Sequence, residues 1–432
     1  MPASANVRAT PVHALPIIGT PVDMRDQGTA GVDVNALQIL DFTKKMLTTP
    51  RSALLDLSSG YSRASAKTVF QDDKLVMLEP NQFGTTYDVE EGCYGYLPES
   101  YGANLALWSE GDVESFDGAS AVTDAPGFNG FSASIGFGDN TTFRFIYRAV
   151  DGIWGTEEAG VKGQWSSFFF RMDDGAAPVV GGNETTGDFV IMVDSVIVPI
   201  EKIVTQKICE GLYRVIAYTE RETSGTSIVE VIKYQTQSSR SFRVTGMHVD
   251  NRTQESLVSS YIPTTTAAVD VAADTWVLPT SAIFADPSLT VSEGTLLVDS
   301  RATSDSLLSE NGSYLLLAFN ESGSYNIAGL FSVKDLGLCA AGVEQTEFTI
   351  AVAPLVAPPV MRNRVALAAS PTGYLAAVNG SAVDATSLNV VPFPLTDTVF
   401  ISGVSLSPKH FIYTLGFAPV ALGQTSLNEV ST

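Results

Sequence analysis

Two tryptophans in glycine-flanked segments are the residues with the most evident binding chemistry. Trp154 stands in the segment DGIWGTEEAG and Trp165 in the segment GQWSSFFF. Glycine-flanked loops often leave a tryptophan exposed, and an exposed indole beside polar groups can stack on a sugar ring. We therefore predict carbohydrate binding at Trp154 and Trp165. The alternative is burial as loop anchors, which looks identical in sequence. Trp108 is interpreted as a core residue.

Acidic turns offer oxygen ligands for a cation. Asp139 precedes an asparagine, and Asp173 and Asp174 precede a glycine. Ca²⁺ takes carboxylate and carbonyl oxygens from segments of this kind. Solvated turns account for the same residues at least as well. Asp139, Asp173 and Asp174 are therefore candidate calcium ligands, and we expect no other cofactor.

Catalytic chemistry has little support in the residue pattern. The three histidines are His13, His248 and His410, and no Gly-x-Ser-x-Gly segment places a serine on a nucleophile elbow. A glycosidase needs two carboxylates on either side of a sugar. Acidic pairs occur at positions 90–91, 157–158 and 173–174, but adjacency in sequence does not place two groups across a substrate. We expect no enzyme and keep a glycan depolymerase as a third hypothesis.

The composition limits the partners. The chain has 432 residues, of which 45% are hydrophobic and 17% charged, and its formal net charge is -22. Such a surface repels phosphate backbones and anionic bilayers, so nucleic-acid binding and membrane insertion are not expected. Cys93, Cys209 and Cys339 form no paired spacing and are interpreted as isolated thiols. No signal peptide is evident, so we expect folding in a reducing cytoplasm.

Residues 1–60 differ from the remainder of the chain. Four prolines between positions 2 and 21 favour an extended arm. A helix is expected at roughly 34–47 because Val34, Leu37 and Leu40 follow helical spacing after Asp33. A flap on the first sandwich explains this region about as well as attachment to an assembly does. The residues expected to mediate assembly are apolar ones of the arm and helix: Val12, Ile17, Ile18, Leu37 and Leu40.

The remainder of the chain has the period of β-strands. Phe143, Phe145 and Tyr147 fall on one face of a strand, and turn residues separate many such runs. Asn379-Gly380 between two alternating segments predicts a type I′ hairpin. The capping-box pattern Ser-Leu-Asn-Glu, which starts at Ser426, predicts a short terminal helix. We predict an all-β fold of two successive antiparallel, jelly-roll-like sandwiches after a short arm and helix. The expected divisions are an arm at 1–60, a first sandwich with lead-in hairpins at 61–265, a linker at 266–288 and a second sandwich at 289–432.

Several stretches taken in order resemble structural proteins of tailed bacteriophages. They are SRASAKTVFQDDKLVMLEPNQFGTTYD, NLALWSE, GLYRVIAYTE, SSYIPTTTAAVDVAAD, SEGTLLVDSRA, RNRVALAASPTGYLAAVNGSAV and SLNEVS. Together they cover about residues 61–432. The resemblance implies a carbohydrate-module-like jelly roll followed by a concanavalin-A-like (laminin-G-like) sandwich. Leu212 stands where tryptophan is usual, and the usual arginine before the opening strand is missing from residues 98–103.

The resemblance implies a virion protein assembled in the host cytoplasm. We expect a tail fibre or baseplate appendage that presents glycan-binding-type sandwiches for attachment to the host. The alternative is a decoration protein of the capsid or tail with a purely architectural role. Other virion proteins and a host-surface glycan are the expected partners, and such appendages are usually homotrimers.

Overall fold

The chain folds into β-sheets throughout the part that the structure describes. A computed structural model describes residues 38–43, 60–99, 101–111, 113–139, 142–152, 163–220, 225–250, 259–279, 292–304, 313–320, 327–333, 337–344, 349–356, 361–390, 398–402 and 410–432. Within these ranges, strand pairing in every sheet is antiparallel. The all-β prediction of two antiparallel sandwiches is confirmed. No helix in the described ranges has the length and apolar character to span a membrane.

The N-terminal sandwich consists of two sheets. Sheet I has the order β15-β16-β12-β18-β10-β9 and sheet II the order β14-β13-β17-β11-β8. Sheet I contains β9 (Thr123–Pro126), β10 (Ala133–Phe137), β12 (Gly163–Met172), β15 (Ile203–Cys209), β16 (Leu212–Glu220) and β18 (Phe242–Asp250). Sheet II contains β8 (Asp117–Ser120), β11 (Arg144–Gly152), β13 (Val190–Val193), β14 (Val196–Ile197) and β17 (Gly225–Lys233). Alternate residues such as Phe168, Phe170, Ile191 and Val231 meet in one core between the sheets.

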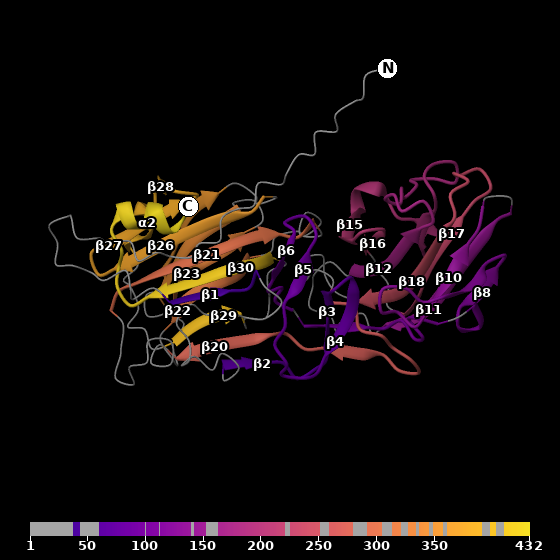
Figure 1. Cartoon of the computed structure of the whole chain (residues 1–432), viewed down its shortest axis with the longest axis horizontal. Helices are drawn as coiled ribbons and strands as arrows, with labels where there is room; N and C mark the ends of the chain where they lie inside the picture. The colour runs from indigo at the N-terminus through magenta and orange to yellow at the C-terminus, as the bar shows by residue number, and fades with distance from the viewer. Residues whose placement is uncertain are drawn as a thin grey trace, which may run out of the picture.

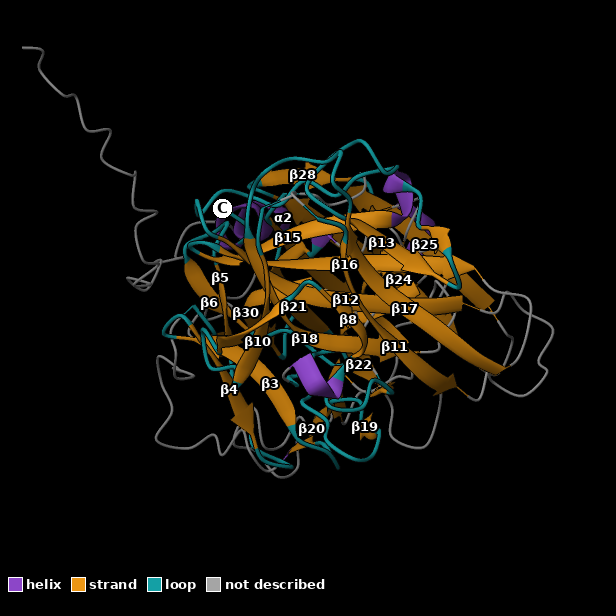
Figure 2. Cartoon of the chain, turned by 90° about the vertical axis from the view of Figure 1, so that its right-hand side faces the viewer, coloured by secondary structure: helices purple, strands orange, loops and turns teal. Residues whose placement is uncertain are grey.

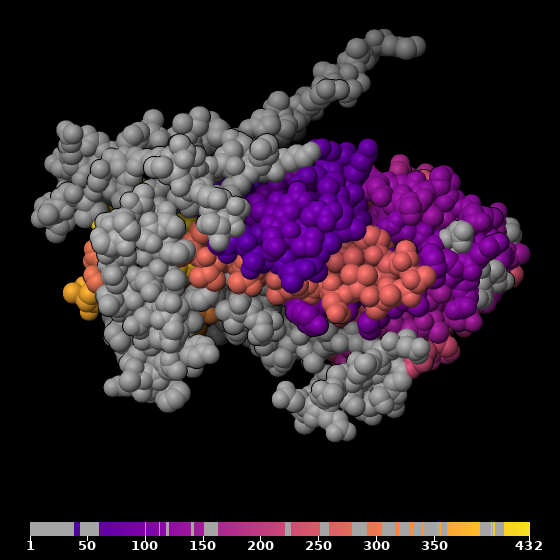
Figure 3. Space-filling view, turned by 90° about the horizontal axis from the view of Figure 1, so that it is seen from below, coloured from indigo at the N-terminus to yellow at the C-terminus, as the bar shows by residue number. Residues whose placement is uncertain are grey.

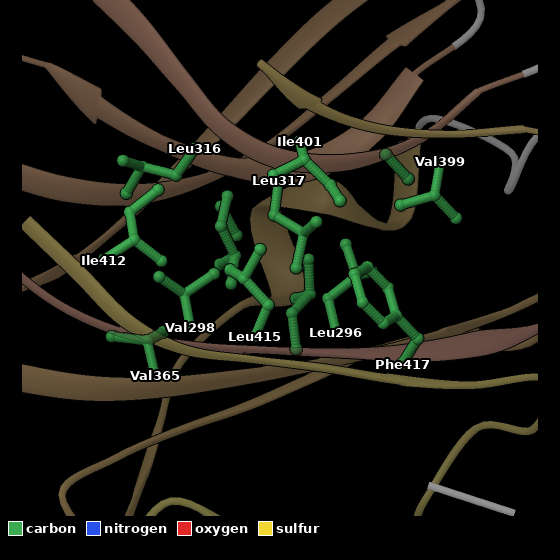
Figure 4. Packing of buried hydrophobic residues seen from close by; sticks show 14 of the residues in the cluster. Leu296, Val298, Leu316, Leu317, Val365, Val399, Ile401, Ile412, Leu415 and Phe417 are labelled. Carbon is green, nitrogen blue, oxygen red and sulfur yellow. The ribbon is translucent and has the colours of Figure 1, made fainter. Parts of the chain in front are cut away.

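The C-terminal sandwich is the larger of the two. Sheet III has the order β1-β30-β21-β26-β27-β28 and sheet IV the order β2-β20-β29-β22-β23-β24-β25. Sheet III contains β1 (Gln38–Asp41), β21 (Gly294–Ala302), β26 (Asn363–Ser370), β27 (Gly373–Val378), β28 (Ser381–Val383) and β30 (His410–Ala418). Sheet IV contains β2 (Tyr61–Ser62), β20 (Thr275–Pro279), β22 (Ser313–Asn320), β23 (Ile327–Val333), β24 (Gly337–Glu344), β25 (Thr349–Val356) and β29 (Thr398–Ser402). Side chains of the two sheets point toward one another in Figure 4, for example Leu415 and Ile401.

The two sandwiches are not strictly successive in sequence. Strand β1 pairs with β30, and β2 pairs with β20, so segments on both sides of the N-terminal sandwich contribute to the C-terminal one. The ends of the intervening segment lie together, because β7 (Gly102–Asn104) pairs with β19 (Val269–Val271). The N-terminal sandwich is therefore an insertion between strands of the C-terminal sandwich. The expected linker, 266–288, contains β19 and β20 in its described part.

Two short hairpins lie between the sandwiches (Figure 1). We call residues 63–99 the hairpin module; it contains β3 (Lys67–Gln71), β4 (Lys74–Leu78), β5 (Thr86–Asp88) and β6 (Cys93–Gly95). Phe70 of β3 packs with Phe131 and Phe169 against sheet I, on the face opposite the sandwich core. Figure 3 shows this indigo segment in contact with the magenta N-terminal sandwich. The hairpin module thus covers part of the outer face of sheet I.

Buried ion pairs join the hairpin module to the C-terminal part of the chain. Asp274, directly before β20, binds Lys67 Nζ at 2.8 Å and Arg63 Nη1 at 3.2 Å, and the carboxylate is fully buried. Asp88 of β5 binds Arg301 Nη2 of β21 at 2.6 Å. Buried charges are stable only when they are paired in this way. The two networks fix the module against the C-terminal sandwich.

Three local predictions have different outcomes. The helix expected at roughly 34–47 is wrong where the chain is described, because Gln38–Asp41 form strand β1; tertiary pairing with β30 overrides a weak helical pattern. The Asn379-Gly380 hairpin is confirmed, with φ of 47° and 81°. The final helix, α2 (Gln424–Val430), begins two residues before Ser426, which the sequence suggested as its cap, and has no side-chain cap. Short 3₁₀ turns occupy Val113–Ser115, Ile200–Lys202 and Thr386–Val390.

Candidate functional site

The outer face of sheet II carries a line of aromatic side chains. Phe143, Phe145 and Tyr147 alternate with Arg144, Ile146 and Arg148, and Ile146 points into the core. Because successive side chains of a strand point to opposite faces, the three aromatic rings lie on the outer face. Tyr234, directly after β17, adds a fourth ring beside Phe143. We call these four residues, Phe143, Phe145, Tyr147 and Tyr234, the aromatic strip.

The rings of the aromatic strip form a continuous surface. The ring centroids of Phe143 and Phe145 are 5.4 Å apart, and those of Phe143 and Tyr234 are 5.1 Å apart. Phe145 and Tyr147 are 6.3 Å apart and nearly parallel, with an interplanar angle of 7°. Phe143 is 39% exposed, and the other three rings are half-buried. A row of flat, partly exposed rings on a sheet is a platform for a flat apolar ligand surface.

The strip has a firm base and one carboxylate in its middle. Ile232 lies opposite Phe145 and is buried, so it supports the rings from β17. Glu230 lies directly opposite Tyr147 and, on its other side, opposite Met192 of β13. Directly opposite residues share a face of the sheet. Glu230 therefore places an acceptor beside the rings, and Tyr147 and Tyr234 each add a hydroxyl.

The environment of the strip is apolar and negatively charged. Burial raises the pKa of Glu230, and the nearby Asp194 raises it further, although the Ser195 backbone N–H opposes the shift. Burial also raises the pKa of Tyr234, as do the charges of Glu184 and Glu230. A half-buried carboxylate with a raised pKa gains most from a ligand that donates hydrogen bonds to it.

Sheet II leaves its outer face open, in contrast to sheet I. The hairpin module packs on part of the outer face of sheet I, whereas Phe143 at 39%, Ile228 at 37% and Val196 at 65% are exposed on sheet II. Figure 2 looks onto this end of the molecule, where β11, β17 and β13 run side by side. An exposed apolar face rimmed by polar groups is typical of a binding surface.

The tryptophans predicted to bind sugar do not form this surface. Trp165 on β12 is 0% exposed and packs against Tyr218, with ring centroids 4.9 Å apart, so its assignment as an exposed sugar platform is wrong. A strand position, not a loop, buries it. Trp154 lies outside the described residues. Trp108, interpreted as core, is 44% exposed and has a positive φ of 53°.

The aspartates predicted to hold Ca²⁺ are not brought together. Asp174 accepts two hydrogen bonds from the Arg240 guanidinium, at 2.7 and 2.8 Å. This ion pair, together with the hydrogen bond from the Ala176 backbone N–H, lowers the pKa of Asp174 to about 2. Asp139 lies 4.0 Å from Arg144 at the end of sheet II. Asp173 is an exposed turn residue. The described residues contain no group of three His, Cys, Asp or Glu side chains that could hold a metal ion.

Assembly residues predicted in the arm lie mostly outside the described residues: Val12, Ile17, Ile18 and Leu37. Leu40 is described, and its assignment to contacts between copies is wrong. Its side chain is 2% exposed in the core of the C-terminal sandwich. The β1 pairing with β30 turns it inward.

One buried cluster resembles a hydrolytic triad in composition only. Ser259 Oγ lies 3.1 Å from His248 Nε2 and 3.1 Å from Asp250 Oδ2. In a catalytic triad the aspartate holds the histidine, whereas here the serine lies between them. All three side chains are buried, at 2% exposure or less. The cluster therefore satisfies polar groups beneath the segment 259–264.

A small cavity of about 90 Å³ lies between the hairpin module and the two sandwiches. Its charged lining residues are engaged with neighbours: Arg301 with Asp88, and Lys207 with Glu210. Arg214 donates to Ser167 Oγ at 2.9 Å. The cavity is thus a gap between packed parts whose charged side chains already bind neighbouring groups.

Comparisons with known proteins identify no family. No family model matches the chain, and no curated protein matches it. Among solved structures, the carbohydrate-binding module CBM40 of a Ruminococcus gnavus IT-sialidase, bound to α2,3-sialyllactose, is 19% identical; the match covers 36% of this chain and 91% of that one, with a TM-score of 0.27. A Trypanosoma rangeli sialidase is 9% identical, over 84% of this chain and 61% of that one, with a TM-score of 0.28. Likenesses this weak carry no argument about function.

Proposed function

We propose that this chain is a non-enzymatic, glycan-binding structural protein of a tailed-bacteriophage virion, and that the aromatic strip holds the sugar. The observation that carries the glycan part is the strip itself, four adjoining rings on an open sheet face with Glu230 among them. The virion part rests on the ordered series of sequence stretches between residues 61 and 432.

A saccharide suits this surface physically. One face of a pyranose ring presents C–H groups, which pack on an aromatic ring, and its edge presents hydroxyls. The carboxylate of Glu230 can accept from a hydroxyl, and the hydroxyls of Tyr147 and Tyr234 can accept or donate. The strip is shallow, so a single site binds weakly. Several copies on one particle would provide firm attachment through avidity.

The proposal places the chain in an appendage, a tail fibre or baseplate component assembled in the host cytoplasm. The anchoring element is the arm within residues 1–60, without Leu40, and the expected oligomer is a homotrimer. A decoration protein would instead cover the strip with a neighbouring subunit. Locating the chain in an electron-microscopy map of the intact virion distinguishes these two positions.

A glycan array with matched variants tests the binding role. Phe143→Ala combined with Tyr147→Ala should reduce binding to every glycan that the unaltered protein retains. The control is Tyr101→Ala, because Tyr101 is 59% exposed and lies beside β7, away from sheet II. Thermal unfolding of each variant should show that all remain folded. Absence of any retained glycan, or equal loss in the control, contradicts the proposal.

A further inference from the structure

The charges around the aromatic strip are of one sign. Glu230 lies within it, and Asp194, in the turn after β13, accepts a hydrogen bond from the Ile228 backbone N–H at 2.9 Å. Asp117 on β8, opposite Tyr147, lies 4.0 Å from Arg148 and is neutralised by it. Asp194 acts on Glu230, and Glu184 acts on Tyr234, through their charges. Acidic groups therefore border the rings from β17 and from the turn after β13.

The basic residues of the same strands are turned away from the strip. Arg144 and Arg148 alternate with the aromatic residues on β11, and Lys233 lies opposite Arg144. The Arg144 guanidinium donates to the carbonyls of Asp139 and Ala121. That of Arg148 lies 4.9 Å from the ring centroid of Phe116 and 4.0 Å from the carboxylate of Asp117. Lys233 Nζ donates to the backbone carbonyls of Ser238 at 2.9 Å and Arg240 at 2.7 Å. Arg144, Arg148 and Lys233 therefore contact other groups of the protein and do not face a ligand on the strip.

This arrangement discriminates between classes of sugar. A carboxylated sugar would bring a negative charge close to Glu230 and Asp194, and both contacts would be repulsive. An ammonium group would meet a half-buried carboxylate flanked by electron-rich ring faces. Carboxylate contacts and ring faces both attract a cation, most strongly where water is partly excluded.

We infer that the aromatic strip selects saccharides that carry free amino groups, such as glucosamine-containing chains, and disfavours carboxylated ones. This inference rests on the proposed glycan-binding function and adds the ligand class. The carboxylate of Glu230 binds the amino group in this scheme, and the aromatic rings supply contacts that do not depend on charge.

Two oligosaccharides with the same backbone isolate the charge. One is a β-1,4-linked glucosamine hexamer, and the other is its fully N-acetylated form, which has no ammonium groups. A sialic acid oligomer provides the carboxylated case. Calorimetric titration of the full chain at neutral pH should show the glucosamine hexamer binding about tenfold or more tighter than the acetylated one. The sialic acid oligomer should show no binding.

Glu230→Gln is the decisive variant because it preserves shape and removes the charge. It should weaken glucosamine binding about tenfold and change binding of the acetylated hexamer by less than about twofold. Glu79→Gln makes the same charge change at an exposed residue of the hairpin module and should change neither. Circular dichroism melts establish that both variants remain folded.

The possible results distinguish failure of the proposed sugar selectivity from failure of the proposed glycan-binding function. Equal binding of the two hexamers, or tighter binding of the sialic acid oligomer, overturns the selection while the glycan-binding role stands. Binding of no saccharide, here and on the array, overturns both. Light scattering adds a further outcome: self-association lost in Phe143→Ala would show that a second copy occupies the strip, which also overturns both.

Discussion

Replacing Asp274 by asparagine should destabilise the whole chain, because it removes the charge at the centre of a buried network. Its carboxylate accepts hydrogen bonds from five groups: Tyr61 Oη at 2.6 Å, Lys67 Nζ at 2.8 Å, the Glu99 N–H at 2.9 Å, Arg63 Nη1 at 3.2 Å and Tyr96 Oη at 3.2 Å. Asparagine keeps the volume but leaves two buried cations without a counter-ion. The expected loss is about 3–5 kcal/mol in the free energy of unfolding.

The direction of the pH effect follows from the same contacts. Burial alone would raise the pKa of Asp274, but Lys67, Tyr61 and Arg63 outweigh it, so the pKa is lowered from 3.8. A carboxylate whose folded pKa is lowered contributes stability that is present at neutral pH and is lost as the pH falls through the folded value. The Asp274→Asn variant should therefore lose less stability than the unaltered protein below about pH 4.

Urea unfolding, followed by circular dichroism, measures the loss. Asp384→Asn is the control, since Asp384 is exposed and the substitution should leave the free energy of unfolding nearly unchanged. Combining Asp274→Asn with Lys67→Met removes one stranded cation and should recover part of the loss. A loss below about 1 kcal/mol for Asp274→Asn, or no recovery in the double variant, would refute the account of this network.

Three further outcomes are expected. Trp165→Ala should lower the free energy of unfolding in urea by about 3–5 kcal/mol, because the side chain is buried. The molecules that remain folded should bind glycan with unchanged affinity, and weakened binding without lost stability would contradict the burial of Trp165. Residues 288–432 alone should show no cooperative thermal transition, because this fragment lacks strands β1, β2 and β20. A second fragment, residues 36–432 with a short glycine-rich turn in place of residues 105–268, keeps these strands and should show a cooperative transition. Burial, aided by the charge of Arg301, lowers the pKa of His410 to about 3. An unfolded histidine takes up a proton below about pH 6.5, so stability from neutral His410 should fall by about 1 kcal/mol per pH unit from pH 6 downward. His410→Gln should remove that slope in melts at several pH values.

The sequence was informative where physical causes are local. Alternation over Thr142–Arg148 predicts strand β11 and the shared face of Phe143, Phe145 and Tyr147, and Asn379-Gly380 predicts the β27–β28 turn. The pairing of β1 with β30 could not be read in this way, because the partner lies near the other end of the chain. A four-residue strand with only two apolar residues cannot be told from a helical turn until its partner is known.

Part of the candidate site could be predicted from the same alternation of residues. The alternation identified three of its rings but did not say which face of the strand would be buried. That depends on Ile146 entering the core between sheets I and II. Glu230 gave no signal of its own, because only the register between β11 and β17 places it opposite Tyr147. Trp165 misled because its neighbouring glycine suggested a loop, whereas Gly163 is the first residue of β12.

The insertion of one sandwich into the other affects the order of folding during synthesis. The N-terminal sandwich has all its strands once β18 has left the ribosome, and it can then fold at once. Strand β1 is made before the N-terminal sandwich, yet it must wait for β30, which is made after that sandwich. Throughout that interval the backbone edge of β1 has no partner, so it can pair with the β30 of another copy whose own β1 has not yet docked. Exchange of β1 between neighbouring copies would preserve every native contact and link them without a new interface. Neighbouring copies that are still being synthesised would then be linked into oligomers through strand β1.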